Sequence, residues 1–184
     1  QHPYLQGVMG GEGEQAFLQL MEHYITKNRA LCEVQNLVYQ DNKGIHKNKQ
    51  GPLLALSEVP FPYEDMEKFE NRIIYYESSR GCPYSCSYCL SSVEKKLRFR
   101  NLELVEKELQ FFLDRKVKQV KFVDRTFNVW HTHAMAIWQY IFNHDNGVTN
   151  FHFEIAADLL TEAEITLLQQ MRPGLVQLEI GIQS

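Results

Sequence analysis

Three of the four cysteines in this chain lie within one short segment, Arg80-Gly81-Cys82-Pro83-Tyr84-Ser85-Cys86-Ser87-Tyr88-Cys89. Their spacing is C-x3-C-x2-C, and thiolates this close together are suited to hold a soft metal centre. A structural zinc ion and a ferredoxin-type cubane each take four protein ligands, but no fourth ligand lies nearby in the sequence. Three thiolates on a four-iron cluster leave one iron open to a small-molecule ligand. The spacing leaves two alternatives: a zinc knuckle completed by a distant histidine, and a disulfide.

Composition and charge limit the kind of protein. The chain has 184 residues, of which 44% are hydrophobic and 23% charged, and its formal net charge is −4. A chain of this length can bury one hydrophobic core. The charge gives no general electrostatic basis for binding nucleic acid or a membrane, and no apolar run reaches the ~18 residues that a membrane span needs. Clustered cysteines favour metal binding in a reducing compartment over a disulfide framework, so we expect a cytoplasmic protein.

Strand and helix patterns alternate around the cysteine segment. Strands are predicted at 73–77, 119–124, 151–156 and 176–181, and amphipathic helices at 102–113, 134–142 and 165–171. Thr161-x-x-Glu164 is a capping box at the start of the third helix, and Pro173-Gly174 ends it. This alternation predicts βαβ units and a parallel sheet.

The N-terminal third has a different pattern. Gly10-Gly11-Glu12-Gly13-Glu14 precedes a helical pattern that runs to about Tyr24. The glycines predict either an anion-binding nest or a tight turn, and the two glutamates argue against phosphate. A hairpin over 36–48 and a proline-containing linker over 51–63 follow. Cys32, alone in this region, is expected to be a buried small residue.

Two predicted strands carry polar residues at every second position. The polar members are His152, Glu154, Gln177 and Glu179. Parallel strands covered by helices on both faces should be almost wholly apolar. The alternation therefore indicates a wet, ligand-holding interior of an α/β barrel, although an edge strand facing solvent would show the same pattern.

The cysteine motif, with Tyr88 directly before its last cysteine, resembles the cluster loop of the radical S-adenosylmethionine (SAM) superfamily. Gly11-Glu12-Gly13-Glu14, the hairpin, the linker, Ser79-Arg80-Gly81-Cys82-Pro83 and Glu179-Ile180-Gly181-Ile182-Gln183-Ser184 together resemble its cobalamin-binding group. The resemblance implies an α/β fold with a partial (β/α) barrel, truncated, at 72–184. A hairpin and linker would occupy 31–71, and the end of a Rossmann-like cobalamin-binding domain 1–30. The chain is expected to be a piece of a longer protein, without full activity alone.

The same resemblance assigns cofactors. Cys82, Cys86 and Cys89 would hold a [4Fe–4S] cluster whose open iron binds SAM, with Tyr88 beside the adenine; the full-length protein is a candidate to bind cobalamin. Ligands of parallel α/β folds lie at the carboxyl ends of strands. Further cofactor-binding candidates are Asp124, Arg125, Thr126, Glu154, Glu179, Gln183 and Ser184.

Several of these residues have a structural alternative. Family members carry a Gly-Gly-Glu-like segment where this sequence has Asp124-Arg125-Thr126. Asp124 is predicted either to accept the SAM ammonium group or to cap a helix or loop, and Glu154 and Glu179 either to bind SAM or to form a structural salt bridge. Two histidines, His131 and His133, are expected to be capping or surface residues, and two arginines, Arg98 and Arg100, to be solvated.

The implied function is reductive cleavage of SAM to methionine and a 5′-deoxyadenosyl radical, in cobalamin-dependent methyl transfer or rearrangement. The implied partner is an electron donor of the flavodoxin or ferredoxin type; the sequence indicates no substrate and no catalytic residue. Two alternatives are a cobalamin-independent radical SAM oxidoreductase or methylthiotransferase, and a zinc-stabilised binding module without enzymatic activity.

Overall fold

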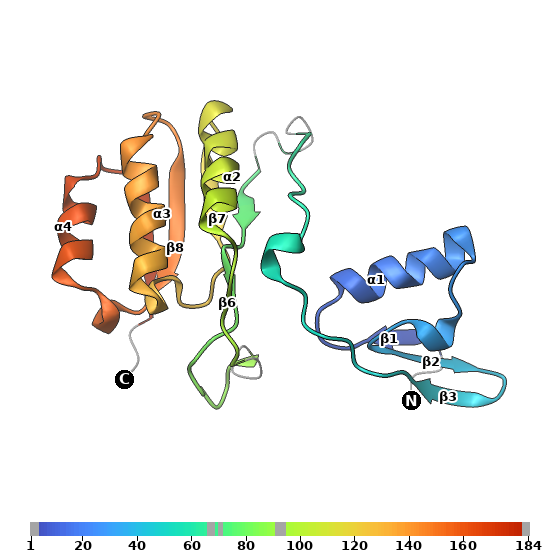
Figure 1. Ribbon diagram of the computed structural model, residues 1–184. Coiled ribbons are helices and arrows are strands. Elements are labelled where there is room, and N and C mark those ends of the chain that lie inside the picture. The colour runs from blue at the N-terminus through green and yellow to red at the C-terminus, as the bar shows by residue number, and fades with distance from the viewer. Residues whose placement is uncertain (1–3, 66–68, 70–71, 91–94, 182–184) are drawn as a thin grey trace. The chain divides into compact units, whose positions relative to one another are not determined.

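The computed structural model describes residues 4–65, 69, 72–90 and 95–181. Its internal contacts divide the chain into two compact units, Gln1–Leu54 and Ala55–Ser184 (Figure 1). No helix in the described part of the chain is long and apolar enough to cross a membrane.

Four parallel strands form the sheet of the larger unit, and they stand side by side in chain order. They are β4 (Ile74–Tyr76), β7 (Gln119–Phe122), β8 (Asn150–Ile155) and β9 (Val176–Ile180). The predicted parallel sheet is thus confirmed. Among the described residues it is open, with β4 and β9 at its edges.

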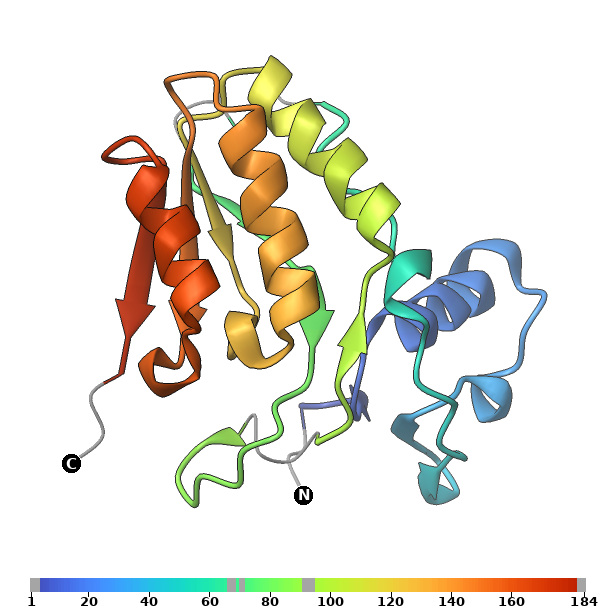
Figure 2. The ribbon, with the colours of Figure 1, turned by 60° about the vertical axis from the view of Figure 1, so that its left-hand side comes forward.

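Three helices cover one face of this sheet (Figure 2). They are α2 (Leu102–Asp114), α3 (His131–Asn143) and α4 (Glu162–Gln170). Short 3₁₀ turns lie at Leu56–Glu58, Phe127–Val129 and Ala157–Leu159. A two-stranded antiparallel pair, β5 (Ser79–Arg80) and β6 (Arg98–Phe99), lies outside the main sheet.

The core fills the space between the sheet and the helices. Ala134, Ile137, Trp138 and Ile141 recur at the spacing of one helical face of α3, and all four are fully buried. Trp138 meets an aromatic group from the strands and the turn before α3, made of Phe122, Phe127 and Phe153, whose ring centroids lie 4.3 to 5.4 Å apart. Such aromatic contacts add to the hydrophobic burial that holds the helices on the sheet.

The capping box at the start of α4 is confirmed. Thr161 Oγ1 accepts from the backbone N–H of Glu164 at 3.3 Å, and the Glu164 carboxylate accepts from the backbone N–H of Thr161 at 2.8 Å. Glu164 also lies 3.0 Å from His131 Nδ1, so it ties α3 to α4 while it caps the helix.

Arg100 is buried, contrary to the prediction that it is solvated. Its guanidinium makes two bonds to the Glu108 carboxylate, Nε–Oε2 at 2.8 Å and Nη2–Oε1 at 2.5 Å. Tyr76 donates its hydroxyl to the same carboxylate at 2.6 Å, and Arg100 also donates to the carbonyl oxygens of Leu56 and Val59. The prediction failed because Glu108 lies on the inward face of α2, where a carboxylate requires a buried cation.

The smaller unit is a three-stranded antiparallel sheet with one helix. The strands are β1 (Gly7–Met9), β2 (Leu37–Asp41) and β3 (Gly44–Lys47), in that order, and the helix is α1 (Glu14–Met21), continued by a π-helical turn at Glu22–Thr26. The predicted hairpin is confirmed as β2–β3, whereas β1 was not predicted. Cys32 is exposed, not buried as expected, because Val34 takes the inward position beside it.

Candidate functional site

The cysteine loop leaves the sheet at the carboxyl end of β4, where β7, β8 and β9 also end (Figure 2). Its base is held by the β5–β6 pair, in which Ser79 lies opposite Phe99 and Arg80 opposite Arg98. Gly81 follows with φ +104°, and a Cβ there would lie 2.5 Å from the Lys96 carbonyl oxygen. Only glycine fits this position, because both the backbone angle and the close approach exclude a side chain.

The three cysteines of the loop differ in exposure. Cys82 is buried, Cys89 is half-buried and Cys86 is exposed. The backbone N–H of Cys89 donates to the Cys86 carbonyl at 3.2 Å, which makes a turn between them. No disulfide joins any of the chain's four cysteines, all of which the structure describes. The structure therefore does not contain the disulfide that the spacing left as an alternative.

The donor set of this loop fits an iron–sulfur cluster with one open iron. It supplies three thiols, and within the described ranges no three His, Cys, Asp or Glu side chains are gathered closely enough to hold a metal ion. The three sulfurs are therefore not preassembled, and the closed set of four ligands that structural zinc requires is not present in that part of the chain either. Metal sites whose ligands come together on binding are common, because binding itself orders them.

Tyr84 of the cysteine loop lies near the loop that follows β8. The pKa of its phenol is raised, first by burial and then by the negative charges of Asp158, Cys82 and Cys86. Asp158 lies in the 3₁₀ turn after β8. The cysteine loop thus extends over the same edge of the sheet as the other predicted ligand loops. Tyr88, predicted to lie beside adenine, is 76% exposed.

Asp124 faces the interior of the protein. It is 1% exposed, and its carboxylate accepts hydrogen bonds from Ser78 and Ser79. Burial is the main reason that the pKa of Asp124 rises from its ordinary 3.8 to about 6, although these hydrogen bonds oppose the rise. Of the two predicted roles, this geometry favours the loop-capping one. Its neighbour Arg125 is exposed, and Thr126 is half-buried.

His133 is buried, which corrects the prediction that it is a capping or surface residue. Its Nε2 lies 3.2 Å from Ser78 Oγ, and its ring packs against Phe99 and Trp130. Burial lowers the pKa of His133 to about 4, so the ring is neutral at physiological pH. His131 is half-exposed.

Asp124 makes the stability of the fold depend on pH in a defined direction. Its carboxyl binds a proton more tightly in the folded than in the unfolded state, so its contribution to the free energy of unfolding is present at low pH and is lost as pH rises from about 4 to about 6. His133 acts in the opposite sense, because its pKa is lowered. We expect the stability of the wild type relative to Asp124→Asn to fall by about 2 to 3 kcal/mol across this range. Urea unfolding at a series of pH values measures this difference, and a flat or rising difference would contradict it.

The face of the sheet away from the helices carries a charged group, as the alternation predicted. Lys121 Nζ lies 3.1 Å from Glu179 Oε2 and 3.9 Å from Glu154 Oε1, and His152 Nε2 lies 3.1 Å from Glu179 Oε2. Lys121 is the first cause of the lowered pKa of Glu179. The salt-bridge alternative is thus present. The side chains of Lys121, Glu154 and Glu179 are partly exposed, whereas His152 Nε2 is buried.

Some predicted site residues cannot be placed, and others were not foreseen. Gln183 and Ser184 lie outside the described residues. Asn128 was not predicted as a site residue. Its buried side-chain amide donates to the C=O and accepts from the N–H of Ala156, directly after β8. Ser78 and Ser79 were not predicted as site residues either. Two hydroxyl residues directly after a strand were the available signal for the serines, whereas nothing near Asn128 in sequence indicates its partner.

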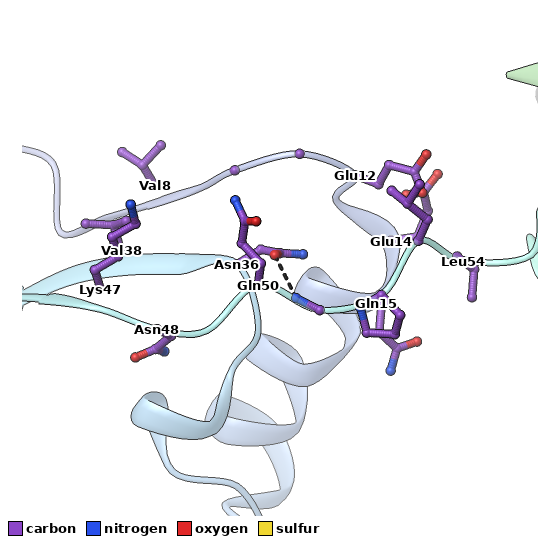
Figure 3. Close-up of a pocket in the computed structure, with 15 residues that line it drawn as sticks. Val8, Glu12, Glu14, Gln15, Asn36, Val38, Lys47, Asn48, Gln50 and Leu54 are labelled. Atoms are coloured by element: carbon purple, nitrogen blue, oxygen red, sulfur yellow. Dashed lines mark hydrogen bonds between the residues drawn. The ribbon is translucent and has the colours of Figure 1, made fainter. Parts of the chain in front are cut away.

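The smaller unit has a pocket of its own, of about 410 Å³ (Figure 3). Gly10 and Gly11 form part of its wall, with Glu12 and Glu14 at one end and Lys47 at the other. Gly11 has φ +70°, which a tight turn explains. The two glutamates give the pocket the wrong charge for phosphate.

The sequence profile of the Radical SAM superfamily matches residues 76–184, which contain the cysteine loop and the whole parallel sheet from Tyr76 onwards. The chain belongs to this superfamily.

Two curated relatives are methyltransferases by name. The chain is 30% identical over 145 residues to "Uncharacterized methyltransferase PH0819" of Pyrococcus horikoshii, which covers 73% of this chain and 31% of that protein. It is 27% identical over 141 residues to "Cobalamin-dependent radical SAM methyltransferase TokK" of Streptomyces tokunonensis, covering 70% of this chain and 21% of that protein. The chain thus spans less than a third of the length of these relatives.

Solved structures share the fold. TsrM from Kitasatospora setae, a radical SAM methyltransferase determined with cobalamin and a [4Fe-4S] cluster, matches with a TM-score of 0.72 and 16% identity, over 96% of this chain and 37% of that one. The cobalamin-dependent SAM radical enzyme OxsB, with aqua-cobalamin and SAM bound, matches with a TM-score of 0.73 and 23% identity, over 97% and 28%. At these identities the likeness establishes the fold.

Proposed function

We propose that the chain is the cluster-binding part of a cobalamin-dependent radical SAM methyltransferase. The observation that carries the proposal is the loop with three cysteines that form no disulfide, at the carboxyl edge of a parallel sheet in a member of this superfamily, with no closed set of four metal ligands among the described residues. Methyl transfer, rather than rearrangement, is supported by the names of the curated relatives.

In this proposal Cys82, Cys86 and Cys89 hold a [4Fe–4S] cluster. When bound, the cluster supplies the electron that cleaves SAM. The chain's own residues orient the cofactor and exclude water. Tyr88, whose side chain is exposed, is the proposed neighbour of the adenine ring. Arg125 and Thr126, which follow β7, remain proposed contacts. Gln183 and Ser184, outside the described residues, also remain proposed contacts.

The charged group on the open sheet face is the proposed ligand surface of the barrel interior. Glu154 and Glu179 offer carboxylate oxygens that suit hydroxyl or ammonium groups, and charge-assisted bonds of this kind are the stronger ones. Lys121 keeps the pKa of Glu179 low, so that carboxyl is ionised and accepts hydrogen bonds. We propose cobalamin, an electron donor of the flavodoxin or ferredoxin type, and a cytoplasmic location for the complete protein.

Anaerobic reconstitution with iron and sulfide tests this function in the protein expressed from its complete gene. We expect a brown protein with close to four irons per chain as a cubane requires, and release of 5′-deoxyadenosine from SAM after reduction. Stoichiometric zinc without iron would favour the binding module. Retention of cobalamin separates the methyltransferase from a cobalamin-independent radical SAM enzyme.

A further inference from the structure

A buried hydrogen-bond network lies at the base of the cysteine loop, and the proposed function does not yet use it. Its centre is the Asp124 carboxylate. Oδ1 accepts from the hydroxyls of Ser78 at 2.7 Å and Ser79 at 2.5 Å, and Oδ2 accepts from the backbone N–H of Ser78 at 3.0 Å. All three residues are 5% exposed or less. Three hydrogen bonds to one desolvated carboxylate are strong bonds, because one partner is charged.

His133 extends the network on the side of α3. Its Nε2 lies 3.2 Å from Ser78 Oγ, whose hydrogen is already donated to Asp124. The histidine therefore donates to the serine, which assigns its proton to Nε2. His133 is 2% exposed and packed between aromatic rings, so Ser78 is fixed on two sides.

This network holds the residues that lead directly into the cluster motif. The backbone N–H of Arg100 also donates to the Ser78 carbonyl at 2.8 Å. Ser79 begins β5, Gly81 makes the constrained turn, and buried Cys82 follows. Cys86, further along the loop, is exposed, and Cys89 is half-buried. Cys82 thus directly follows a fixed stretch of backbone, whereas Cys86 and Cys89 lie further along the loop.

We infer that Asp124 is a positioning residue for the cluster: by holding Ser78 and Ser79 it fixes Cys82 before the cluster binds, and Cys86 and Cys89 then close around the metal. The inference rests on the proposed function. It assigns Asp124 to the support of the cluster loop instead of to SAM itself.

The test compares Asp124→Asn and Ser79→Ala with the wild type, in protein expressed from the complete gene and reconstituted anaerobically. Asp114→Asn is the matched control, because the same change is made at an exposed carboxylate on α2. Iron and sulfide content, the rate at which a chelator removes iron, and the electron paramagnetic resonance spectrum of the reduced cluster are measured. Circular dichroism confirms that each variant is folded.

We expect Asp124→Asn to lose iron to the chelator about tenfold faster or more, because the charge is lost and the amide NH2 cannot accept from the Ser78 backbone N–H as Oδ2 does. Its spectrum should broaden, since Cys82 no longer has one position. Ser79→Ala should show a smaller effect of the same kind. The double variant should lose iron no faster than Asp124→Asn, because both changes act on the same bond between Ser79 and Asp124. Asp114→Asn should match the wild type.

Wild-type cluster retention and an unchanged spectrum in folded Asp124→Asn would overturn the inference and leave the proposed function standing. If Asp124→Asn does not fold, the rate of iron loss and the spectrum of Ser79→Ala test the inference instead, since this variant removes only one hydroxyl. A wild-type protein that takes up no cluster would overturn the proposed function and this inference together.

Discussion

Replacing any one of Cys82, Cys86 and Cys89 with alanine is expected to give a folded protein that retains no iron–sulfur cluster. A cubane held by three thiolates has no spare protein ligand, so the loss of one leaves two irons without a protein bond. The loop lies outside the helix-and-sheet core, and only Cys82 is buried, so the helices should persist. Iron and sulfide analysis after anaerobic reconstitution measures the first effect, and circular dichroism the second.

Cys32→Ala is the matched control for this series. Cys32 is an exposed cysteine of the smaller unit, outside the motif, and its replacement should leave the iron content unchanged. Iron retained at the wild-type level by one of the three loop variants would remove that cysteine from the ligand set. Iron lost in Cys32→Ala would show that the set was assigned incorrectly.

Arg100→Ala is expected to lower the free energy of unfolding of the larger unit by about 3 to 5 kcal/mol, because it leaves the Glu108 carboxylate buried without its cation. Both side chains of the pair are 6% exposed or less. The same substitution also removes the bonds that hold the Leu56 and Val59 carbonyls. Both tryptophans of the chain, Trp130 and Trp138, lie in this unit, so urea unfolding followed by tryptophan fluorescence reports on it.

Arg115→Ala is the control for this measurement. Arg115 is an exposed arginine of the same unit, placed over the Phe111 ring at 3.5 Å, and such contacts contribute about 0.5 to 1 kcal/mol. Equal losses in the two variants would show that Arg100 behaves as a surface residue. A combined replacement of Arg100 and Glu108 by methionine and leucine should recover much of the loss, because no buried charge then remains.

The sequence predicted the strands and helices of the larger unit because their signals are local. Apolar spacing along α3 and the Thr161–Glu164 capping box depend on residues a few positions apart. The polar face of β8 and β9 was also legible, because alternation is a property of the strand itself. The short strand β1 was missed, since its three residues carry no alternation of their own and it is defined by pairing with β2.

The misassigned side chains have partners that are distant in sequence or on another element. Arg100 was predicted to be solvated because Glu108 and the carbonyls of Leu56 and Val59 come from other segments. His133 was placed at the surface, although Ser78 accepts from it across the interior. The candidate site could be located from the spacing of three cysteines, but the network that supports its base could not, because a sequence does not show which loop carboxylate points inward.

The order of the parallel strands bears on how the protein is made. Because β4, β7, β8 and β9 are neighbours in the order of synthesis, each strand–helix unit can dock onto the preceding one as the chain leaves the ribosome. The first strands to pair are β4 and β7, and the cysteine loop lies in the segment that connects them. The segment that carries the three cysteines is therefore anchored at both ends by a strand pair before the last strands have been translated.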